Sequence, residues 1–227
     1  WLSSVSRKRR NILGASGATI SNTGAVLLYT GGTGFGYGGV VGTINNVNAA
    51  ISADCTLQNS SDVNGYSHVG GIVGNIQYIS ASQAPFNDTA GAGHVGVNNT
   101  GNVISATHYA GGLFGAVQAD SITIANYTNT ADVSGAENYV GGVAGMVNKG
   151  TLGVSGGIIA NTGDVTGTGN YVGGIVGSFN SVIPGTISVA SDSGFENSGN
   201  VSGTSYVGGI IGNIVAGTIP GGVTFGQ

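Results

Sequence analysis

The chain has few side chains that could carry out acid–base or nucleophilic chemistry. Its three histidines are His68, His94 and His108, and its single cysteine is Cys55. An enzyme needs such groups brought together in one pocket. His68 fills a position that other copies of a repeat (described below) give to tyrosine, and His108 one that they give to serine or asparagine. We therefore interpret both as variants of structural positions, whereas His94 lies in a glycine-rich stretch without a second ligand nearby in sequence.

Two aspartates form the one candidate metal site. Asp132 and Asp164 occupy equivalent positions in neighbouring repeats, and Asp62, Asn102 and Asn200 occupy that position in others. Stacked repeats would bring the two carboxylates to about 5 Å, where they would repel each other unless a cation bound between them. Calcium prefers oxygen ligands of this kind. The alternative is a solvated turn, and we expect no cofactor.

Motifs that carry known chemistry do not occur in the sequence. It has no HExxH, no paired CxxC and no GxSxG, and the glycine-rich stretch 31–36 lacks the GK[ST] ending of a phosphate loop, so we interpret it as a loop insertion. Beyond residue 10 the only lysine or arginine is Lys149. That distribution disfavours the clustered acids and bases of carbohydrate-cleaving β-helices. The sequence therefore predicts a protein that is not an enzyme.

Positive charge is concentrated at the start of the chain. Four of the five cationic residues are Arg7, Lys8, Arg9 and Arg10, and the formal net charge is −4. Nucleic-acid binding needs basic residues spread over a face, so we do not expect it. We interpret residues 1–16 as a basic arm that is either solvated or docked on an acidic neighbouring copy; a processing signal is the third interpretation.

The composition predicts an ordered chain. It contains 46 glycines and is 40% hydrophobic but only 6% charged, whereas disordered chains combine low hydrophobicity with high charge. Collagen would need glycine at every third position and more than three prolines. No stretch has the ~18 apolar residues of a transmembrane helix. With no second cysteine, Cys55 is either a small buried group or part of an interchain disulfide.

Six copies of one unit organise the sequence. Each copy has a glycine pair followed by two apolar residues and a third glycine, and the signature Asn-[Thr/Ser]-x-x-Val precedes each pair. The pairs begin at Gly38, Gly70, Gly111, Gly141, Gly173 and Gly208, with spacings of 32, 41, 30, 32 and 35 residues. The asparagines are Asn22, Asn59, Asn99, Asn129, Asn161 and Asn197. The valines are Val26, Val63, Val103, Val133, Val165 and Val201.

This repeat predicts an all-β fold. Valine, isoleucine and tyrosine favour strands over residues 171–176 and 206–211, and a connector strand recurs at 121–124 and 186–189, giving about three strands per unit. One unit cannot bury its apolar face, but stacked units can. We expect a parallel β-solenoid or an open stack of β-arches, with about six irregular units of 30–41 residues in one domain, 17–227. The units lie near 20–58, 59–98, 99–128, 129–160, 161–196 and 197–227.

Stacking assigns roles to the repeated residues. In a parallel stack equivalent residues form ladders, so the valines form an apolar ladder, the asparagines an amide ladder at a turn, and the paired glycines mark a place where bulk is excluded. N-glycosylation sequons, consistent with an exported protein, occur at Asn59, Asn87, Asn98, Asn126 and Asn200.

Two stretches resemble the GLUG motif, a short repeat of prokaryotic surface and secreted proteins. They are Gly163–Gly167 leading to Tyr171–Gly177, and Gly199–Gly203 leading to Tyr206–Gly212. The resemblance covers most of residues 20–214 and is weakest in the first copy, where Tyr37 takes the valine slot. It implies an extracellular, adhesin-like or wall-associated β protein with no defined chemistry.

The ends of the repeat suggest self-association. Residues 17–21 and 217–221 both match the connector strand at 185–188, so the repeat begins and stops within a unit. Strand edges not blunted by charge or proline pair with other chains, and Pro220 is the blunting residue near the end. We therefore expect the partner to be a further copy of the chain, joined head to tail or through lateral contacts between strand edges. We hypothesise a non-catalytic extracellular structural protein that self-assembles into an amyloid-like filament, tube or sheath, similar to the sheaths of some prokaryotic cells. The alternatives are an adhesin-type repeat fragment and a module whose surface binds carbohydrate or cell wall.

Overall fold

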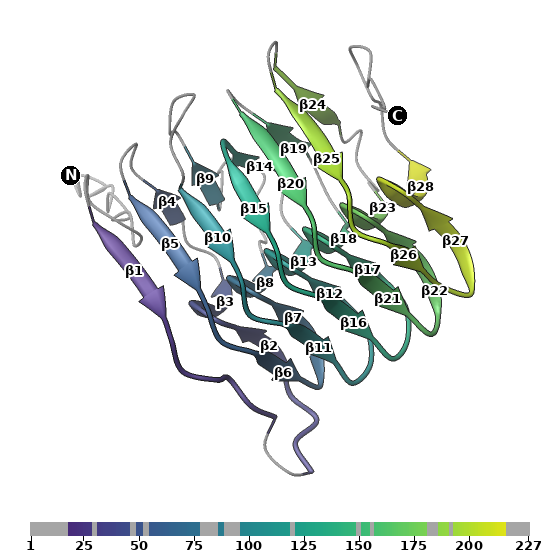
Figure 1. Ribbon diagram of the computed structural model, residues 1–227, viewed down its shortest axis with the longest axis horizontal. Helices are drawn as coiled ribbons and strands as arrows, with labels where there is room; N and C mark the ends of the chain where they lie inside the picture. The colour runs from purple at the N-terminus through teal and green to yellow at the C-terminus, as the bar shows by residue number, and fades with distance from the viewer. Residues whose placement is uncertain are drawn as a thin grey trace, which may run out of the picture.

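The chain folds as a parallel β-solenoid (Figure 1). The computed structural model describes residues 18–28, 31–45, 49–51, 55–77, 86–88, 96–118, 121–148, 151–154, 157–180, 186–190 and 193–216; for 49–51, 86–88, 121 and 216 only the backbone is described. Every strand pair in the described part is parallel, and no helix occurs there. The predicted fold class is confirmed.

The strands form five sheets, which we call A to E. Sheet A comprises β1 (Thr19–Asn22), β5 (Thr56–Asn59), β10 (Val97–Asn99), β15 (Tyr127–Asn129), β20 (Ile158–Asn161) and β25 (Gly194–Asn197). Sheet B comprises β6 (Val63–Gly65), β11 (Val103–Ser105), β16 (Val133–Gly135), β21 (Val165–Gly167) and β26 (Val201–Ser202). Sheet C comprises β2 (Phe35–Gly38), β7 (Ser67–Gly70), β12 (Ala110–Gly111), β17 (Val140–Gly141), β22 (Asn170–Gly173) and β27 (Ser205–Gly208). Sheet D comprises β3 (Val41–Asn45), β8 (Val73–Gln77), β13 (Phe114–Gln118), β18 (Ala144–Val147), β23 (Val176–Asn180) and β28 (Ile211–Ala216). Sheet E comprises β4 (Ala49–Ile51), β9 (Phe86–Asp88), β14 (Ser121–Ile124), β19 (Thr151–Val154) and β24 (Ile187–Val189).

A complete coil therefore has five strands, one in each sheet, and the expectation of three was wrong. Residues 171–176, expected as one strand, divide between β22 and β23 because the chain bends at Gly174 and Ile175. The Asn-x-x-x-Val signature likewise bends the chain between sheets A and B. Glycine and asparagine thus separate short strands within segments whose apolar residues suggest longer ones.

Two apolar cores run along the solenoid. The A–D–E core lies between those three sheets and contains fully buried side chains such as Leu57, Ile76 and Ile122. The B–C core contains the valine ladder, with Val103 of sheet B and Val172 of sheet C both completely buried. In the register, each signature valine pairs with the valine of the next coil, from Val26 to Val201.

The first strand does not lie where the sequence suggested. Residues 17–21 resemble the connector strand at 185–188, which belongs to sheet E, yet β1 pairs with β5 in sheet A. The Asn22–Asn59 pair fixes this register, because each asparagine ends a sheet A strand. A Thr-Ile-Ser triplet fits either position, so the resemblance carried too little information to decide. Residues 217–227, including Pro220, lie outside the described residues.

Candidate functional site

The six signature asparagines form a continuous amide ladder between the two cores. Each Nδ2 donates to the Oδ1 of the asparagine in the next coil, at 2.7–2.8 Å, from Asn22 to Asn197. The same Nδ2 also donates to the carbonyl oxygen two residues ahead, as Asn129 does to Ala131 at 2.7 Å. Asn99 and Asn129 are completely buried. The ladder satisfies amides that would otherwise be costly to bury, and it has a direction, because all its donors point toward the C-terminal end.

Glycine is required in the repeated motif because backbone approaches backbone. A side-chain carbon on the second glycine of a pair would meet the asparagine ladder, as Gly71 would meet Asn99. One on the third glycine, for example Gly145, would meet the carbonyl oxygens of Tyr139 and Ala110 in sheet C. Sheet D therefore packs directly against sheet C, and both faces of strand β8 are buried. These glycines have a packing role.

The residue two positions before each glycine pair lies in the left-handed region of the backbone. The φ angles are +55° at His68, +64° at Tyr109, +70° at Tyr139, +65° at Tyr171 and +53° at Tyr206. Gly36 takes the equivalent place in the first coil with φ +84°, because Tyr37 pairs with Val69. Such angles are uncommon outside glycine and cost about 1–2 kcal/mol.

The rings at this left-handed position stack into an aromatic column. Neighbouring tyrosine rings lie 4.9–5.0 Å apart with interplanar angles of 10–19°, and His68 continues the column 4.4 Å from Tyr109. Phe35, from the preceding position of the first coil, caps His68 at 5.5 Å. Stacking of this kind offsets part of the backbone strain. The sequence shows that His68 and the tyrosines occupy equivalent positions, but it predicts neither their left-handed backbone nor the stacking of their rings.

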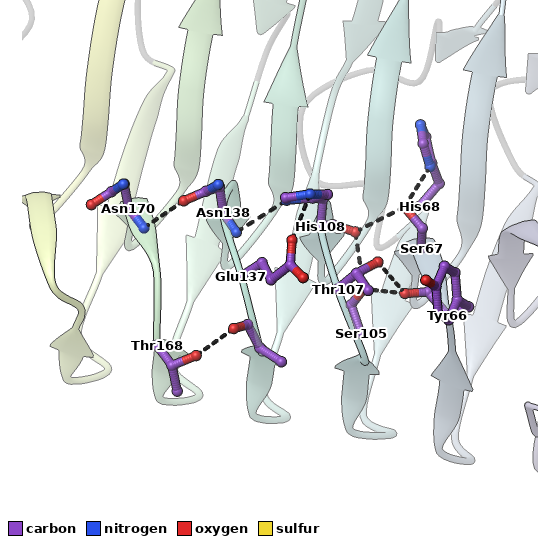
Figure 2. A network of polar contacts seen from close by, with 11 residues as sticks. Tyr66, Ser67, His68, Ser105, Thr107, His108, Glu137, Asn138, Thr168 and Asn170 are labelled. Atoms are coloured by element: carbon purple, nitrogen blue, oxygen red, sulfur yellow. Dashed lines mark hydrogen bonds and ion pairs between the residues drawn. The ribbon is translucent and has the colours of Figure 1, made fainter. Parts of the chain in front are cut away.

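Beside the column runs the polar row that includes His108, Asn138 and Asn170 (Figure 2). The Asn138 backbone N–H donates to His108 Nδ1 at 3.3 Å, and the Asn170 N–H donates to Asn138 Oδ1 at 2.8 Å. His108 therefore carries its proton on Nε2, which lies 2.6 Å from Glu137 Oε2. His108 Nδ1 thus accepts a backbone N–H of the next coil, as Asn138 Oδ1 does one coil later.

Ser67 and the two histidines do not form a nucleophile–base–acid series. Ser67 Oγ lies 2.9 Å from His68 Nδ1, whereas the Glu137 carboxylate contacts His108 (Figure 2). The hydroxyl and the carboxylate thus contact different imidazoles, unlike the arrangement that activates a serine. Burial in the column, with a smaller effect of His108, lowers the pKa of His68 to about 4. This imidazole is neutral at pH 7.

The row of aspartates, each one residue before a sheet B strand, extends the backbone ladder. Asp62 Oδ1 accepts the Asn102 N–H at 3.0 Å, and Asp132 Oδ1 accepts the Asp164 N–H at 2.9 Å. Asp164 Oδ1 in turn accepts from both nitrogens of Asn200, at 2.9 and 3.0 Å. An open depression of about 420 Å³ lies beside this row, lined by Asn102, Ile104, Asp132, Val133, Ser134, Asp164 and Thr166.

The described residues contain no group of three or more histidine, cysteine, aspartate or glutamate side chains that could hold a metal ion. Asp132 and Asp164 are neighbours, as the repeat predicted, but each uses one carboxylate oxygen on a backbone N–H of the next coil. These backbone hydrogen bonds are enough to explain why two exposed carboxylates lie side by side.

No family model, curated protein or solved structure matches the chain. The likeness to the GLUG motif therefore stays a prediction from the residues.

The outermost coils expose strand edges that carry apolar side chains. At the C-terminal end, Tyr206 is 60% exposed, Val207 43% and Val215 62%. At the N-terminal end, Leu27 is 64% and Phe35 63% exposed. Strands β25–β28 contain one charged residue, Glu196, and β1–β3 contain none. Apart from Glu196, the described edge strands lack the charges and prolines that usually blunt a sheet edge.

The remaining predicted residues occupy varied places. Cys55 is completely buried in the A–D–E core, where another chain cannot reach it. Asn59 is 1% exposed with its Nδ2 in two hydrogen bonds, which leaves no space for a glycan on the folded chain. Asn98 and Asn126 are partly exposed, and Asn200 is exposed.

Several predictions fall on residues that the structure does not describe. They concern Arg7, Lys8, Arg9, Arg10, His94 and Lys149, together with the side chain of Asn87. Among the residues that it does describe, no helix is long and apolar enough to span a membrane.

Proposed function

We propose that this chain is a non-catalytic structural protein whose copies assemble end to end through their strand edges. The assembly is a filament, tube or sheath outside the cell, as the resemblance to surface-protein repeats suggests. The observation that carries the proposal is the pair of exposed edges at the two ends of the described solenoid, whose strands contain a single charged residue, Glu196. Unpaired N–H and C=O groups along such edges are templates for another parallel strand.

The use of the repeated side chains supports a structural role. The asparagines bond to one another, the valines fill the B–C core, and the glycines allow sheets C and D to touch. Even His108 and Asp132 serve the ladder by accepting backbone N–H groups of the next coil. Groups committed in this way hold coils together, and an inert, low-charge solenoid suits a load-bearing material.

A concentration series tests the proposal. We expect particle mass, measured by light scattering in mild buffer, to rise with protein concentration, and electron micrographs to show fibres or tubes that survive dilute detergent. A discrete monomer at every concentration would contradict the proposal and favour the adhesin-type repeat fragment, in which neighbouring repeats of a longer chain cover the edges.

The depression on sheet B favours a second function, carbohydrate or cell-wall binding. Hydroxyls of Ser134 and Thr166 lie there with two carboxylates and the half-exposed side chain of Ile104. Polar groups beside an apolar patch are typical of sugar-binding surfaces. Retarded migration in gels containing a polysaccharide, abolished by Asp132→Asn with Thr166→Ala, would support this function; unchanged migration of the wild-type chain would exclude it for the polysaccharides tried.

A further inference from the structure

We infer that the interface between copies is one more turn of the solenoid: the C-terminal edge of one molecule pairs in register with the N-terminal edge of a second copy. In this interface β25 pairs with β1, β27 with β2 and β28 with β3, and Asn197 lies beside Asn22 of the second copy. The inference rests on the proposed self-assembly and specifies its partner, polarity and register.

The amide ladder gives the interface its polarity. Within the chain, Asn161 Nδ2 donates to Asn197 Oδ1 at 2.8 Å. Asn197 Nδ2 uses one hydrogen on the Gly199 carbonyl oxygen at 2.9 Å, and its second hydrogen points outward, toward the place of a next coil. At the opposite end, the one hydrogen bond that Asn22 Oδ1 accepts from the described residues is a long one, 3.3 Å from the Gly24 N–H, so a second lone pair remains for a donor. A donor end therefore meets an acceptor end only when copies stack head to tail.

The backbone hydrogen bonds run in both directions between neighbouring coils and fix the register. In each coil the signature valine donates its N–H to the carbonyl of the residue before the next valine, as Val165 does to Asn200 at 2.8 Å. By this pattern the Val201 N–H would reach the Ala25 carbonyl of a second copy. In the other direction the residue after each asparagine donates to the previous asparagine's carbonyl, as Ser60 does to Asn22 at 3.0 Å. Thr23 of the second copy would bond in this way to Asn197.

The side chains that the edges expose belong to the columns that run through the solenoid. Tyr206 stacks on Tyr171 with one face, 5.0 Å away, and its other face is open at the end of the aromatic column. Phe35 opens the same column at the other end, where its ring covers His68. Val201 and Val26, only partly buried, end the valine ladder of the B–C core. Head-to-tail stacking would continue both the aromatic column and the valine ladder into the second copy. Because the described edge strands contain one charged residue, Glu196, the stacking brings no like charges together.

A disulfide measures the register directly. Glu196 and Ser21 are exposed on sheet A, in the row that pairs Ala160 with Glu196 and Ser21 with Gln58. In the inferred interface they become neighbours across the junction, with Cα atoms about 4.8 Å apart, within the range that a disulfide bridges. Within one molecule the two ends of this six-stranded sheet lie about 24 Å apart at the same spacing, so Glu196→Cys with Ser21→Cys can bridge only between molecules.

The matched control is Glu196→Cys with Leu27→Cys. Leu27 is exposed, as Ser21 is, but it lies six residues further along the chain, beyond the bend between sheets A and B and next to Val26, which pairs with Val63 of sheet B. It therefore lies outside the sheet A row that contains Glu196. Buried Cys55 is the same in both variants. Under mild oxidation of assembled protein, we expect covalent dimers and higher multimers on non-reducing gels from the first pair. The control should give at least ten-fold less.

The outcomes separate this inference from the proposed function. Fibres that give equal cross-linking from both pairs, or none from the first, overturn the register while the self-assembly stands. Wild-type protein that stays monomeric overturns both. If oxidation disturbs the fold, Asn197→Asp is a second test. It keeps the acceptor for Asn161, loses the bond to the Gly199 carbonyl oxygen within the chain, and replaces the outward N–H with a carboxylate oxygen facing Asn22. The concentration needed for assembly should rise about ten-fold or more; an unchanged value contradicts the inference.

Discussion

A side-chain carbon on Gly142 would collide with the amide of Asn161, which lies one coil further along the solenoid. The same atom would meet the carbonyl oxygen of Gly174. The glycine pair and the asparagine signature are therefore the two halves of one contact between the C–D bend and the A–B bend. Because the glycine of one coil meets the asparagine of the next, this contact explains why both signatures recur in every coil.

Gly142→Ala should be among the most destabilising small substitutions in the chain. Relief of the collision requires movement of backbone atoms, and we expect the free energy of unfolding in urea to fall by about 3 kcal/mol. Gly153→Ala is the matched control, because its Cβ would lie 3.5 Å from its nearest neighbour, Thr123 Oγ1. A control as unstable as Gly142→Ala would show that glycine is needed for reasons other than this contact.

The amide ladder should contribute more to stability than the outward-facing polar residues beside it. Asn129→Ala leaves the Asn99 donor, the Asn161 acceptor and the Ala131 carbonyl oxygen without their shared partner inside the protein. Each unsatisfied buried group costs about 1–3 kcal/mol, so a loss of about 3 kcal/mol or more is expected in urea unfolding. Thr128→Ala, one residue earlier and partly exposed, should change stability by less than about 0.5 kcal/mol. Similar losses in the two variants would contradict a structural role for the ladder.

Much of this architecture can be predicted from the sequence because repetition identifies equivalent residues. Six asparagines and six valines in one spacing can be aligned by eye, and parallel stacking places each beside its equivalent. The first coil shows the strength of the pattern: Tyr37 fills the position directly before the glycine pair, which is valine or alanine in the other copies, and it still pairs with Val69. Amide-to-amide bonding then follows from chemistry, because asparagine is both donor and acceptor.

Conformation within each coil could not be predicted in the same way. Tyrosine favours strands, so the left-handed backbone of Tyr139 contradicts its intrinsic preference, and only packing of the column explains it. The division of residues 171–176 depends on a glycine bend whose direction no periodicity specifies. Whether His108 pairs with Glu137 depends on which coils become neighbours, and such contacts appear only in three dimensions.

The left-handed angle of Tyr139 should reverse the usual order of alanine and glycine. In an extended strand, glycine is less stable than alanine by about 0.5–1 kcal/mol because it loses more backbone entropy. At φ +70° alanine retains the strain that glycine avoids, so Tyr139→Gly should be more stable than Tyr139→Ala by about 1 kcal/mol. Both should be less stable than wild type because the stacking with Tyr109 and Tyr171 is lost. Thermal unfolding of the same two replacements at Thr128 should show the usual order.

His68 should make the protein less stable in mild acid. Its pKa falls from 6.5 in the unfolded chain to about 4 in the column, so between these values the unfolded chain binds the extra proton. Stability contributed by the neutral imidazole is complete above pH 6.5 and declines as the pH falls toward 4. Because part of the ring is solvated, we expect a loss of about 1–2 kcal/mol over this interval. His68→Tyr, which supplies the ring of the other coils, should weaken the dependence between pH 6.5 and 4; an unchanged pH profile would assign it to other groups.

Tyr127 offers a test in the stabilising direction. Its side chain is 1% exposed in the A–D–E core, and its hydroxyl has no hydrogen-bond partner among the described residues. Burial also raises the pKa of this phenol well above its usual value, so the group stays neutral and its only polar contribution is the unsatisfied O–H. The equivalent residues of neighbouring coils, Val97 and Ile159, are apolar. Tyr127→Phe removes one buried polar atom and no contact of the ring, so the free energy of unfolding should rise by about 1 kcal/mol.

The same replacement at Tyr171, whose hydroxyl is on a partly exposed ring, should be close to neutral. A clear loss of stability in Tyr127→Phe alone would mean that the hydroxyl has a partner beyond the described residues, such as a buried water.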